Sequence, residues 1–502
     1  MSEEIRILQL GTEDWNKKYR LPEYLQLDFS EEFLKAPKLA YDLVFIDRPI
    51  DKKELQPLCQ AAKAHTLYVT ERATSDKVLQ ELFFRKAGKC IATAHVQEFL
   101  SKEARNYFPK PYGEKAALSS VGIAQGFAGK VTWNGNKCVS LEGNYGEEFN
   151  QVAFWRYNLP LAKDQAIEIW LEYKKDPGVE LALSVTQFLP GSISGVQRTW
   201  YFSEKELEDM ILLDNTKERG PLFLSLLAKG EGKLDIIAMN DRISRRGHGT
   251  FLPGGKRYVA SNREEIFHYF DPGDLKPPLA VYFSGYKTLQ GFEGYYMMRN
   301  MGCPFLLIAE PRLEGGSFYM GSEEYETALA EIIRSYMKEL GFTEEQVVLS
   351  GLSMGTFGAL YYGCDILPHS IILGKPLASI GDVAANERLH RPGGFPTSLD
   401  VLQKVTGGTD AAAVASLNER FWNKVDNAEW RNTKFVISYM IEDDYDATAY
   451  QTLLSHAKGS GMKIYGKGIH GRHNDDTGAI VAWFKNQYDK ILQEDFSRKA
   501  GR

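Results

Sequence analysis

Features that mark secreted, membrane-spanning or metal-binding chains are scarce in this sequence. Its 502 residues include only five cysteines, which lie far apart and form no C-x-x-C pair. That pattern argues against a disulfide framework or a zinc site. One of the longest apolar runs covers 303–309, far short of the ~20 residues that a membrane-spanning helix needs. The first residues, Met1–Arg6, are polar and acidic, unlike a secretory signal. We therefore expect a protein of the reducing cytosol.

An excess of charge of one sign is also lacking. The 60 basic and 66 acidic residues leave a net charge of −6, so the whole chain has no electrostatic footprint for nucleic acid. Hydrophobic residues make up 43% and charged residues 25%, which is typical of globular proteins and excludes disordered, collagen-like and coiled-coil chains. At about 150 residues per domain, the length predicts roughly three domains.

Residues 1–112 predict a small parallel α/β domain. Short apolar strands are expected at 5–10, 42–47, 66–70 and 89–94, with helical stretches between them. Gly11 follows the first strand, but no further glycine comes after it. A phosphate-binding G-x-G-x-x-G is therefore absent, and we interpret this domain as a degenerate, structural Rossmann-like unit.

Residues 113–270 have the character of a β-sandwich. Strand-like patches alternate with turn residues, and 166–173 largely alternates apolar and polar side chains as a half-buried antiparallel strand does. One helix is expected near 203–212. Four tryptophans in this domain could fill its core or stack on sugars: Trp133, Trp155, Trp170 and Trp200. A cluster of basic residues is interpreted as a solvated hairpin, with contact to an anion as the alternative. The cluster consists of Arg242, Arg245, Arg246, Lys256 and Arg257.

A Pro- and Gly-containing segment at 271–278 opens the third expected domain, 271–502, which holds the chemistry. Gly351, Ser353 and Gly355 form a G-x-S-x-G between the apolar strand Val347–Leu349 and a small, apolar helix-like stretch. This strand–turn–helix pattern predicts a nucleophile elbow, with Ser353 as the nucleophile of an α/β-hydrolase-like domain.

An acidic cluster follows a later apolar strand, where the acid of such a triad is expected. Asp443 is our candidate, with Glu442 and Asp444 as open alternatives. A further short strand ends in a glycine-rich turn that carries His470 and His473, both candidates for the general base. The order serine, acid, histidine is that of the α/β-hydrolase fold. The histidine would take the serine proton, and the carboxylate would orient the imidazole.

An oxyanion hole needs two donors, and the sequence suggests both. The backbone N–H of Met354 directly follows the nucleophile. The second donor is expected in Ser284–Tyr286, after the apolar strand Leu279–Phe283, where Gly285 would let the backbone approach the substrate. Residues ~385–432 combine helical patterns with Pro-Gly turns and could form a cap over the site.

Three segments together resemble the accessory Sec system protein 2 family, which serves the export of serine-rich repeat adhesins in Gram-positive bacteria. They are Gly351–Gly358, Tyr439–Asp446 and Gly471–Asp475. The length and the three-part layout fit as well, so the resemblance covers essentially the whole chain. It implies a triad of Ser353, Asp443 and His473, because the family histidine lies within Gly-Arg-His-Asn. The family acid can be glutamate, so Glu442 stays open at this point.

The resemblance also implies an activity and partners. The activity is serine-dependent O-acetylation of N-acetylglucosamine on the adhesin, before or during export. The partners are two sister accessory Sec proteins, the accessory Sec motor ATPase, the adhesin glycosyltransferases and the adhesin with its glycans. We expect no cofactor besides an acyl donor, no metal, and a cytoplasmic location at the membrane periphery, reached only through partners.

Two other functions are compatible with the same residues. In a carbohydrate esterase, or deacetylase, water would replace the sugar hydroxyl as the acyl acceptor. In a non-catalytic export scaffold, the first two domains, which carry no catalytic signature, would serve assembly with partners. The fold class expected in all three cases is α/β, with a C-terminal α/β-hydrolase-like domain behind a small α/β domain and a β-sandwich.

Overall fold

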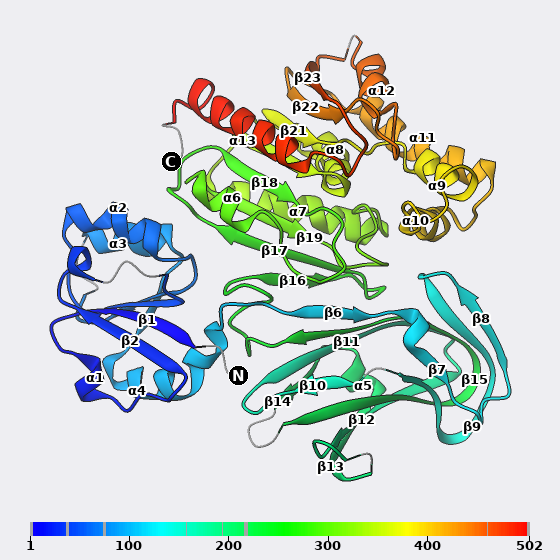
Figure 1. The fold of residues 1–502 in the computed structure, drawn as a ribbon, viewed down its shortest axis with the longest axis horizontal. Coiled ribbons are helices and arrows are strands. Elements are labelled where there is room, and N and C mark those ends of the chain that lie inside the picture. The colour runs from blue at the N-terminus through cyan, green and yellow to red at the C-terminus, as the bar shows by residue number, and fades with distance from the viewer. Residues whose placement is uncertain are drawn as a thin grey trace.

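Three β-sheets, one after another along the chain, organise the molecule (Figure 1). The computed structural model describes residues 4–36, 40–73, 77–156, 158–192, 194–214, 219–458 and 460–498; of Leu34 it describes only the backbone. The α/β class expected from the sequence is confirmed. No helix in the described ranges is long and apolar enough to span a membrane.

The first sheet has five parallel strands in the order β2-β1-β3-β4-β5. Their bounds are β1 (Ile5–Leu10), β2 (Leu25–Ser30), β3 (Leu43–Ile46), β4 (Leu67–Thr70) and β5 (Lys89–Ile91). The helices are α1 (Trp15–Lys18), α2 (Lys52–Ala61), α3 (Lys77–Arg85) and α4 (Val96–Glu98). Alternate residues of β3 enter two apolar cores, one on each face of the sheet. Burial on both faces explains why these strands read as continuous apolar runs.

The second sheet has ten strands, all paired antiparallel. They are β6 (Gly113–Ala116), β7 (Val121–Ile123), β8 (Lys130–Asn134), β9 (Cys138–Trp155), β10 (Leu159–Leu161), β11 (Ala166–Lys175), β12 (Val179–Phe188), β13 (Val196–Ser203), β14 (Ile211–Asp214) and β15 (Gly220–Ile243). The first half of β15 pairs with β12 and the second half with β11. Side chains from both halves meet in one apolar core, as a sandwich requires. The expected helix is a single turn, α5 (Glu204–Leu207).

The third sheet has eight strands in the order β16-β17-β19-β18-β20-β21-β22-β23. Their bounds are β16 (Lys256–Val259), β17 (Glu265–Asp271), β18 (Leu279–Phe283), β19 (Phe305–Ala309), β20 (Val347–Leu352), β21 (Ser370–Gly374), β22 (Lys434–Met440) and β23 (Lys463–Ile469). The six strands from β18 to β23 run parallel. Their carboxyl ends therefore share one edge, where ligands bind in open α/β sheets.

Helices cover both faces of this third sheet. They are α6 (Tyr295–Asn300), α7 (Glu323–Leu340), α8 (Met354–Ile366), α9 (Ile380–Leu389), α10 (Thr397–Thr406), α11 (Ala411–Asn427), α12 (Ala449–His456) and α13 (Thr477–Glu494). In β18, Val281 enters the core that includes α7 and α8, whereas Tyr282 enters the core that includes α6 and α13. Helices α9–α11 form the insertion expected between β21 and β22, beside the sheet (Figure 1).

The strand pairing bears on where the second domain ends. Strands β16 and β17 lie before residue 271, yet β17 pairs antiparallel with β19 of the third sheet. The Pro- and Gly-containing segment at 271–278 is thus a connection inside the third sheet. We propose a boundary between β15 and β16, in place of the one expected at 270. Periodicity finds strands but does not show which sheet a strand joins.

The basic cluster expected to be a solvated hairpin is largely an interior ion network. Arg242 is 1% exposed and donates to both carboxylate oxygens of Glu265 on β17, at 2.8 and 2.6 Å. Arg245 is equally buried and donates to the backbone carbonyls of Asn106, Phe108 and Phe251. The hairpin prediction was wrong here because the partners lie on distant segments. Arg242 therefore links the second sheet to the third, and Arg245 links the end of β15 to the segment that follows the first sheet.

The tryptophans of the sandwich divide into two groups. Trp155 and Trp170 are both buried, but of the two only Trp155 belongs to the apolar core of the sandwich. Trp170 lies on the opposite face of β11, under the guanidinium groups of Arg257 and Arg263. Trp133 is 49% exposed on β8, and the half-buried Trp200 lies under the guanidinium of Arg198, 4.6 Å from its ring centre. The core interpretation thus holds for Trp155, and Trp200 packs against the same core.

Candidate active site

Ser353 stands in a sharp turn between β20 and α8. Its backbone has φ 51° and ψ −121°, a region that a residue with a side chain rarely adopts. A Cβ on Gly351 would lie 2.3 Å from the carbonyl carbon of Gly355, and one on Gly355 would lie 2.1 Å from the carbonyl oxygen of Phe283. Both glycines are therefore sterically required. The local geometry is that of a nucleophile elbow.

A hydrogen-bonded chain leads from the serine to a buried carboxylate. Ser353 Oγ lies 2.8 Å from His473 Nε2, and His473 Nδ1 lies 2.9 Å from Asp443 Oδ2. The three residues follow β20, β22 and β23, whose carboxyl ends lie at the same edge of the sheet. The His473 side chain is 1% exposed and that of Asp443 is 6% exposed. The pairing of serine, histidine and acid expected from the sequence is thus present as geometry.

Asp443 is held ionised by its neighbours. Burial, the largest single effect, acts to raise the pKa of this carboxyl. The hydrogen bond and charge of His473 and the backbone N–H groups of Tyr445 and Asp446 outweigh burial, so the pKa is lowered below its ordinary value. An ionised acid at this position accepts the Nδ1–H of His473, which leaves Nε2 as the acceptor for the serine proton.

The alternative acid and base form a second pair on the surface. His470 Nδ1 lies 3.0 Å from Glu442 Oε1, and their side chains are 86% and 51% exposed. Glu442 also accepts the backbone N–H of Gly471. Asp444 accepts the backbone N–H of His473 and pairs with Arg391 at 2.8 Å. Neither carboxylate is bonded to a ring nitrogen of His473, so the geometry selects Asp443.

An aromatic stack holds the imidazole from the side. The ring of Tyr445 lies 4.5 Å from that of His473, at an angle of 28°. Phe395, from the α9–α10 connection, stacks on Tyr445, and Tyr286 contacts Phe395 edge to face. The guanidinium of Arg391 also lies over the Tyr445 ring, 4.5 Å from its centre. The helical insertion therefore contributes directly to the walls around the histidine.

The expected oxyanion donor Gly285 is not available in the structure. Its N–H donates to Glu293 Oε2 at 2.7 Å. Ser284 N donates to Ile308 O, and Lys287 N donates to Gly315 O. Among the described residues 284–287, the backbone N–H without a hydrogen-bond acceptor is that of Tyr286. Because Glu293 lies eight residues beyond the glycine, nothing in the sequence pattern indicated that contact.

Met354, the other expected donor, opens α8. The first N–H groups of a helix have no partner inside the helix, so its N–H is open to an oxyanion. A Cβ on Gly316 would lie 2.4 Å from the Met354 side chain, and one on Gly315 would lie 2.2 Å from the Tyr286 ring. One glycine pair therefore packs under both donor residues.

The sandwich domain reaches this rim. Lys115 Nζ donates to the carbonyl of Leu313 at 2.7 Å, and burial lowers the pKa of Lys115 to about 8. At the tip of the β8–β9 hairpin, Asn136 donates to Asp400 on α10 and to Glu314. These contacts hold the segment that carries the two packing glycines. Among the described residues, no group of three or more histidine, cysteine or carboxylate side chains is arranged to hold a metal.

Comparison with known proteins places these features in one family. The family model described as Accessory Sec system GspB-transporter matches residues 5–498. An accessory Sec system protein of Streptococcus gordonii is 39% identical over 512 residues, covering 99% of this chain and all of the relative. One of Staphylococcus aureus (strain NCTC 8325 / PS 47) is 36% identical over 513 residues, covering 99% of this chain and 98% of the relative.

A solved structure shares the whole fold. The chain is similar to one in the Glycosylation Associate Protein (Gap123) complex from Streptococcus agalactiae, at 34% identity and a TM-score of 0.87. That match covers 99% of this chain and 100% of the other. The three-sheet arrangement is therefore shared over the full length.

Proposed function

This chain belongs to the Accessory Sec system GspB-transporter family, and on that premise we propose that it joins a role in accessory Sec export to serine-dependent acyl transfer. The proposed reaction is O-acetylation of N-acetylglucosamine on serine-rich repeat adhesins. The observation that carries the catalytic part is the chain Ser353 Oγ, His473 Nε2, His473 Nδ1, Asp443 Oδ2, with successive contacts of 2.8 and 2.9 Å.

In the first half-reaction, Ser353 Oγ attacks the carbonyl carbon of the acyl donor while His473 Nε2 takes the serine proton. The negative charge moves to the carbonyl oxygen, where the N–H groups of Met354 and Tyr286 are proposed to stabilise it. The tetrahedral intermediate then collapses. The bond to the leaving group breaks, His473 delivers the proton to that group, and an acyl-serine remains.

The second half-reaction runs in reverse order. A sugar hydroxyl replaces the leaving group, His473 takes its proton, and the oxygen attacks the acyl-serine. The Ser353 Oγ–acyl bond breaks, the serine recovers its proton from His473, and the sugar carries the ester. Asp443 stays ionised throughout and stabilises the imidazolium that forms twice in each cycle.

The partners we propose follow from family membership. The relative from Streptococcus agalactiae was solved as a complex, which supports work beside two sister accessory proteins. Contact with the accessory Sec motor ATPase and with the glycosylated adhesin is part of the same proposal, as is a cytoplasmic place at the membrane periphery.

A variant pair tests the catalytic part. In Ser353→Ala, acetyl transfer from a radiolabelled donor to an N-acetylglucosamine-bearing adhesin fragment should fall to background, and no acyl-enzyme should be detected by mass spectrometry. Ser335→Ala, at an exposed serine of α7, is the matched control and should transfer normally. Normal transfer by Ser353→Ala would contradict the proposal.

The same assay distinguishes transfer from hydrolysis. Acetate and acetylated glycan are measured together. Acetylated glycan as the main product supports the transferase. Acetate alone, with loss of acetyl groups from a pre-acetylated fragment, would favour the esterase instead.

A further inference from the structure

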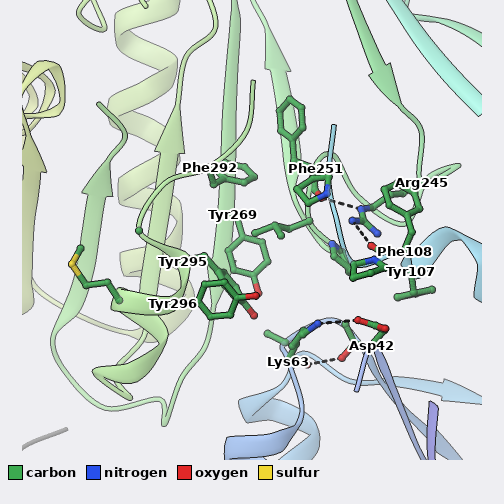
Figure 2. Close-up of a pocket in the computed structure, with 18 residues that line it drawn as sticks. Asp42, Lys63, Tyr107, Phe108, Arg245, Phe251, Tyr269, Phe292, Tyr295 and Tyr296 are labelled. Carbon is green, nitrogen blue, oxygen red and sulfur yellow. Dashed lines mark hydrogen bonds and ion pairs between the residues drawn. The ribbon is translucent and has the colours of Figure 1, made fainter. Parts of the chain in front are cut away.

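A cavity of about 360 Å³ lies where the first domain, the sandwich-side connections and the third sheet meet (Figure 2). Its walls come from the turn before β4, the segment after the first domain, the connection between β15 and β16, and the start of α6. Small-molecule sites favour such domain junctions, and this volume is at the lower end of their usual range. The cavity is separate from the triad, because none of its lining residues belongs to the serine, histidine and acid chain.

Aromatic rings face each other across this cavity. Figure 2 shows tyrosines from β17 and α6 on one side and Phe108 on the other, with two further phenylalanines above. The rings include Phe108, Phe251, Tyr269, Phe292, Tyr295 and Tyr296. Tyr269 and Tyr295 lie 5.6 Å apart, and Tyr295 and Tyr296 lie 5.2 Å apart. A flat ligand between the walls would meet ring faces and edges.

One end of the cavity carries a donor and an acceptor. Lys63 Nζ lies 3.1 Å from Asp42 Oδ1, with the two side chains 24% and 10% exposed (Figure 2). Asp42 Oδ2 also accepts the N–H of Arg6. The ammonium has three N–H groups, so it can donate to a ligand while it stays paired. Arg245, on the opposite side, is already bonded to three backbone carbonyls.

The charge balance argues for a neutral ligand. The charges of Lys63 and Asp42 compensate each other at one end of the cavity. The guanidinium of Arg245 is covered by carbonyl oxygens and by the Phe108 ring, 3.9 Å away. A pyranose matches the remaining features, because its C–H faces stack on aromatic rings. Two neighbouring hydroxyls can accept from Lys63 and donate to Asp42. An apolar molecule would leave that pair unused.

We infer that this junction cavity is a binding site for a neutral sugar ring, held by stacking on the tyrosine wall and by hydrogen bonds to Lys63 and Asp42. The inference does not rest on acyl transfer at Ser353. The site spans two domains, so a bound sugar holds the first domain against the third. Phe292 and Gly294 of its wall flank Glu293, the residue that holds the Gly285 N–H.

Binding of N-acetylglucosamine and glucose to the full chain tests the inference, measured by saturation-transfer difference NMR and calorimetry. Tyr296→Ala removes a ring that is 71% exposed, so the fold should tolerate it. It should weaken sugar binding about tenfold. Lys63→Met keeps the apolar stem and should weaken binding similarly. Tyr201→Ala, 70% exposed on β13, is the matched control and should bind like the unchanged protein.

Three outcomes would overturn the inference. The sugars fail to bind at millimolar concentration; or they bind equally well to Tyr296→Ala and Lys63→Met; or indole, used as an apolar probe, binds in the cavity where the sugars do not. Ser353→Ala should bind sugar in this cavity normally. Failure of acetyl transfer and failure of cavity binding are therefore separable.

Discussion

Two carboxylate–histidine pairs lie on the same two loops, after β22 and β23, and they differ strongly in burial. Glu442 and His470 are joined at 3.0 Å, and Asp443 and His473 at 2.9 Å. The first pair is exposed, at 51% and 86%, and the second is buried, at 6% and 1%. Only the second reaches a serine. Contact between an acid and a histidine is therefore not the signature of a triad.

Burial gives the inner pair two properties that the outer pair lacks. Excluding water makes the hydrogen bond and the charge of each partner count for more. The surrounding backbone N–H groups and the Tyr445 ring also hold both side chains in a single geometry. An exposed ion pair loses side-chain entropy when it forms and is screened by salt, so its net contribution to the free energy of folding is small.

Exchanging the two histidines for alanine gives the largest expected contrast. His473→Ala should reduce kcat for acyl transfer by about 10⁶, because the general base is lost. His470→Ala should leave kcat within about twofold, as surface changes usually do. The rates are compared on one chromogenic acetyl ester. Similar losses in the two variants would remove the distinction between the pairs.

The two acids are compared in the same way. Asp443→Asn keeps the shape but no longer favours the productive tautomer of His473, so kcat should fall by about 10⁴. Glu442→Gln should be nearly silent. If Glu442→Gln proved the more damaging change, the catalytic acid would have to be the exposed residue, and the loops would have to rearrange on substrate binding.

A third carboxylate, Glu293, sharpens the comparison because it acts on the oxyanion loop. Glu293→Ala should free the Gly285 N–H and let the loop carrying Tyr286 move. The expected loss in kcat is at most the about 10²–10³ that one oxyanion donor is worth, with KM little changed. Glu293→Gln keeps an acceptor and should recover most of the rate. A rise in KM alone would indicate a substrate contact instead.

The smallest expected effect is on stability in acid. The folded pKa of Asp443 is lowered, so its contribution is present above the unfolded value of about 3.9 and is lost as pH falls through the folded pKa. The difference in Tm between the unchanged protein and Asp443→Asn should therefore shrink below about pH 4. The pKa of Glu442 is also lowered, first by the Gly471 N–H and then by His470. Because Glu442 is exposed, its Tm difference should be smaller and should decrease with salt.

Local patterns of the sequence were sufficient for the elbow and for the parallel strands. Gly351 and Gly355 are required by backbone contacts within a few residues or with the adjacent strand, so the motif itself carries the geometry. Apolar runs likewise mark strands that are buried on both faces. By contrast, residues 256–270 were expected in the sandwich domain, because β19, the strand through which β17 joins the third sheet, lies some forty residues further on.

What the sequence determined by itself is the candidate nucleophile, the order of serine, acid and histidine, and the α/β class. These depend on short-range sterics and on side-chain periodicity. Only the tertiary structure decided between Asp443 and Glu442 and replaced Gly285 by Tyr286 as the free donor. It also placed Arg242 and Arg245 inside the molecule. Each of these three outcomes depends on which distant group shields a side chain from water or accepts its hydrogen bond. The spacing of residues along the chain does not indicate those contacts.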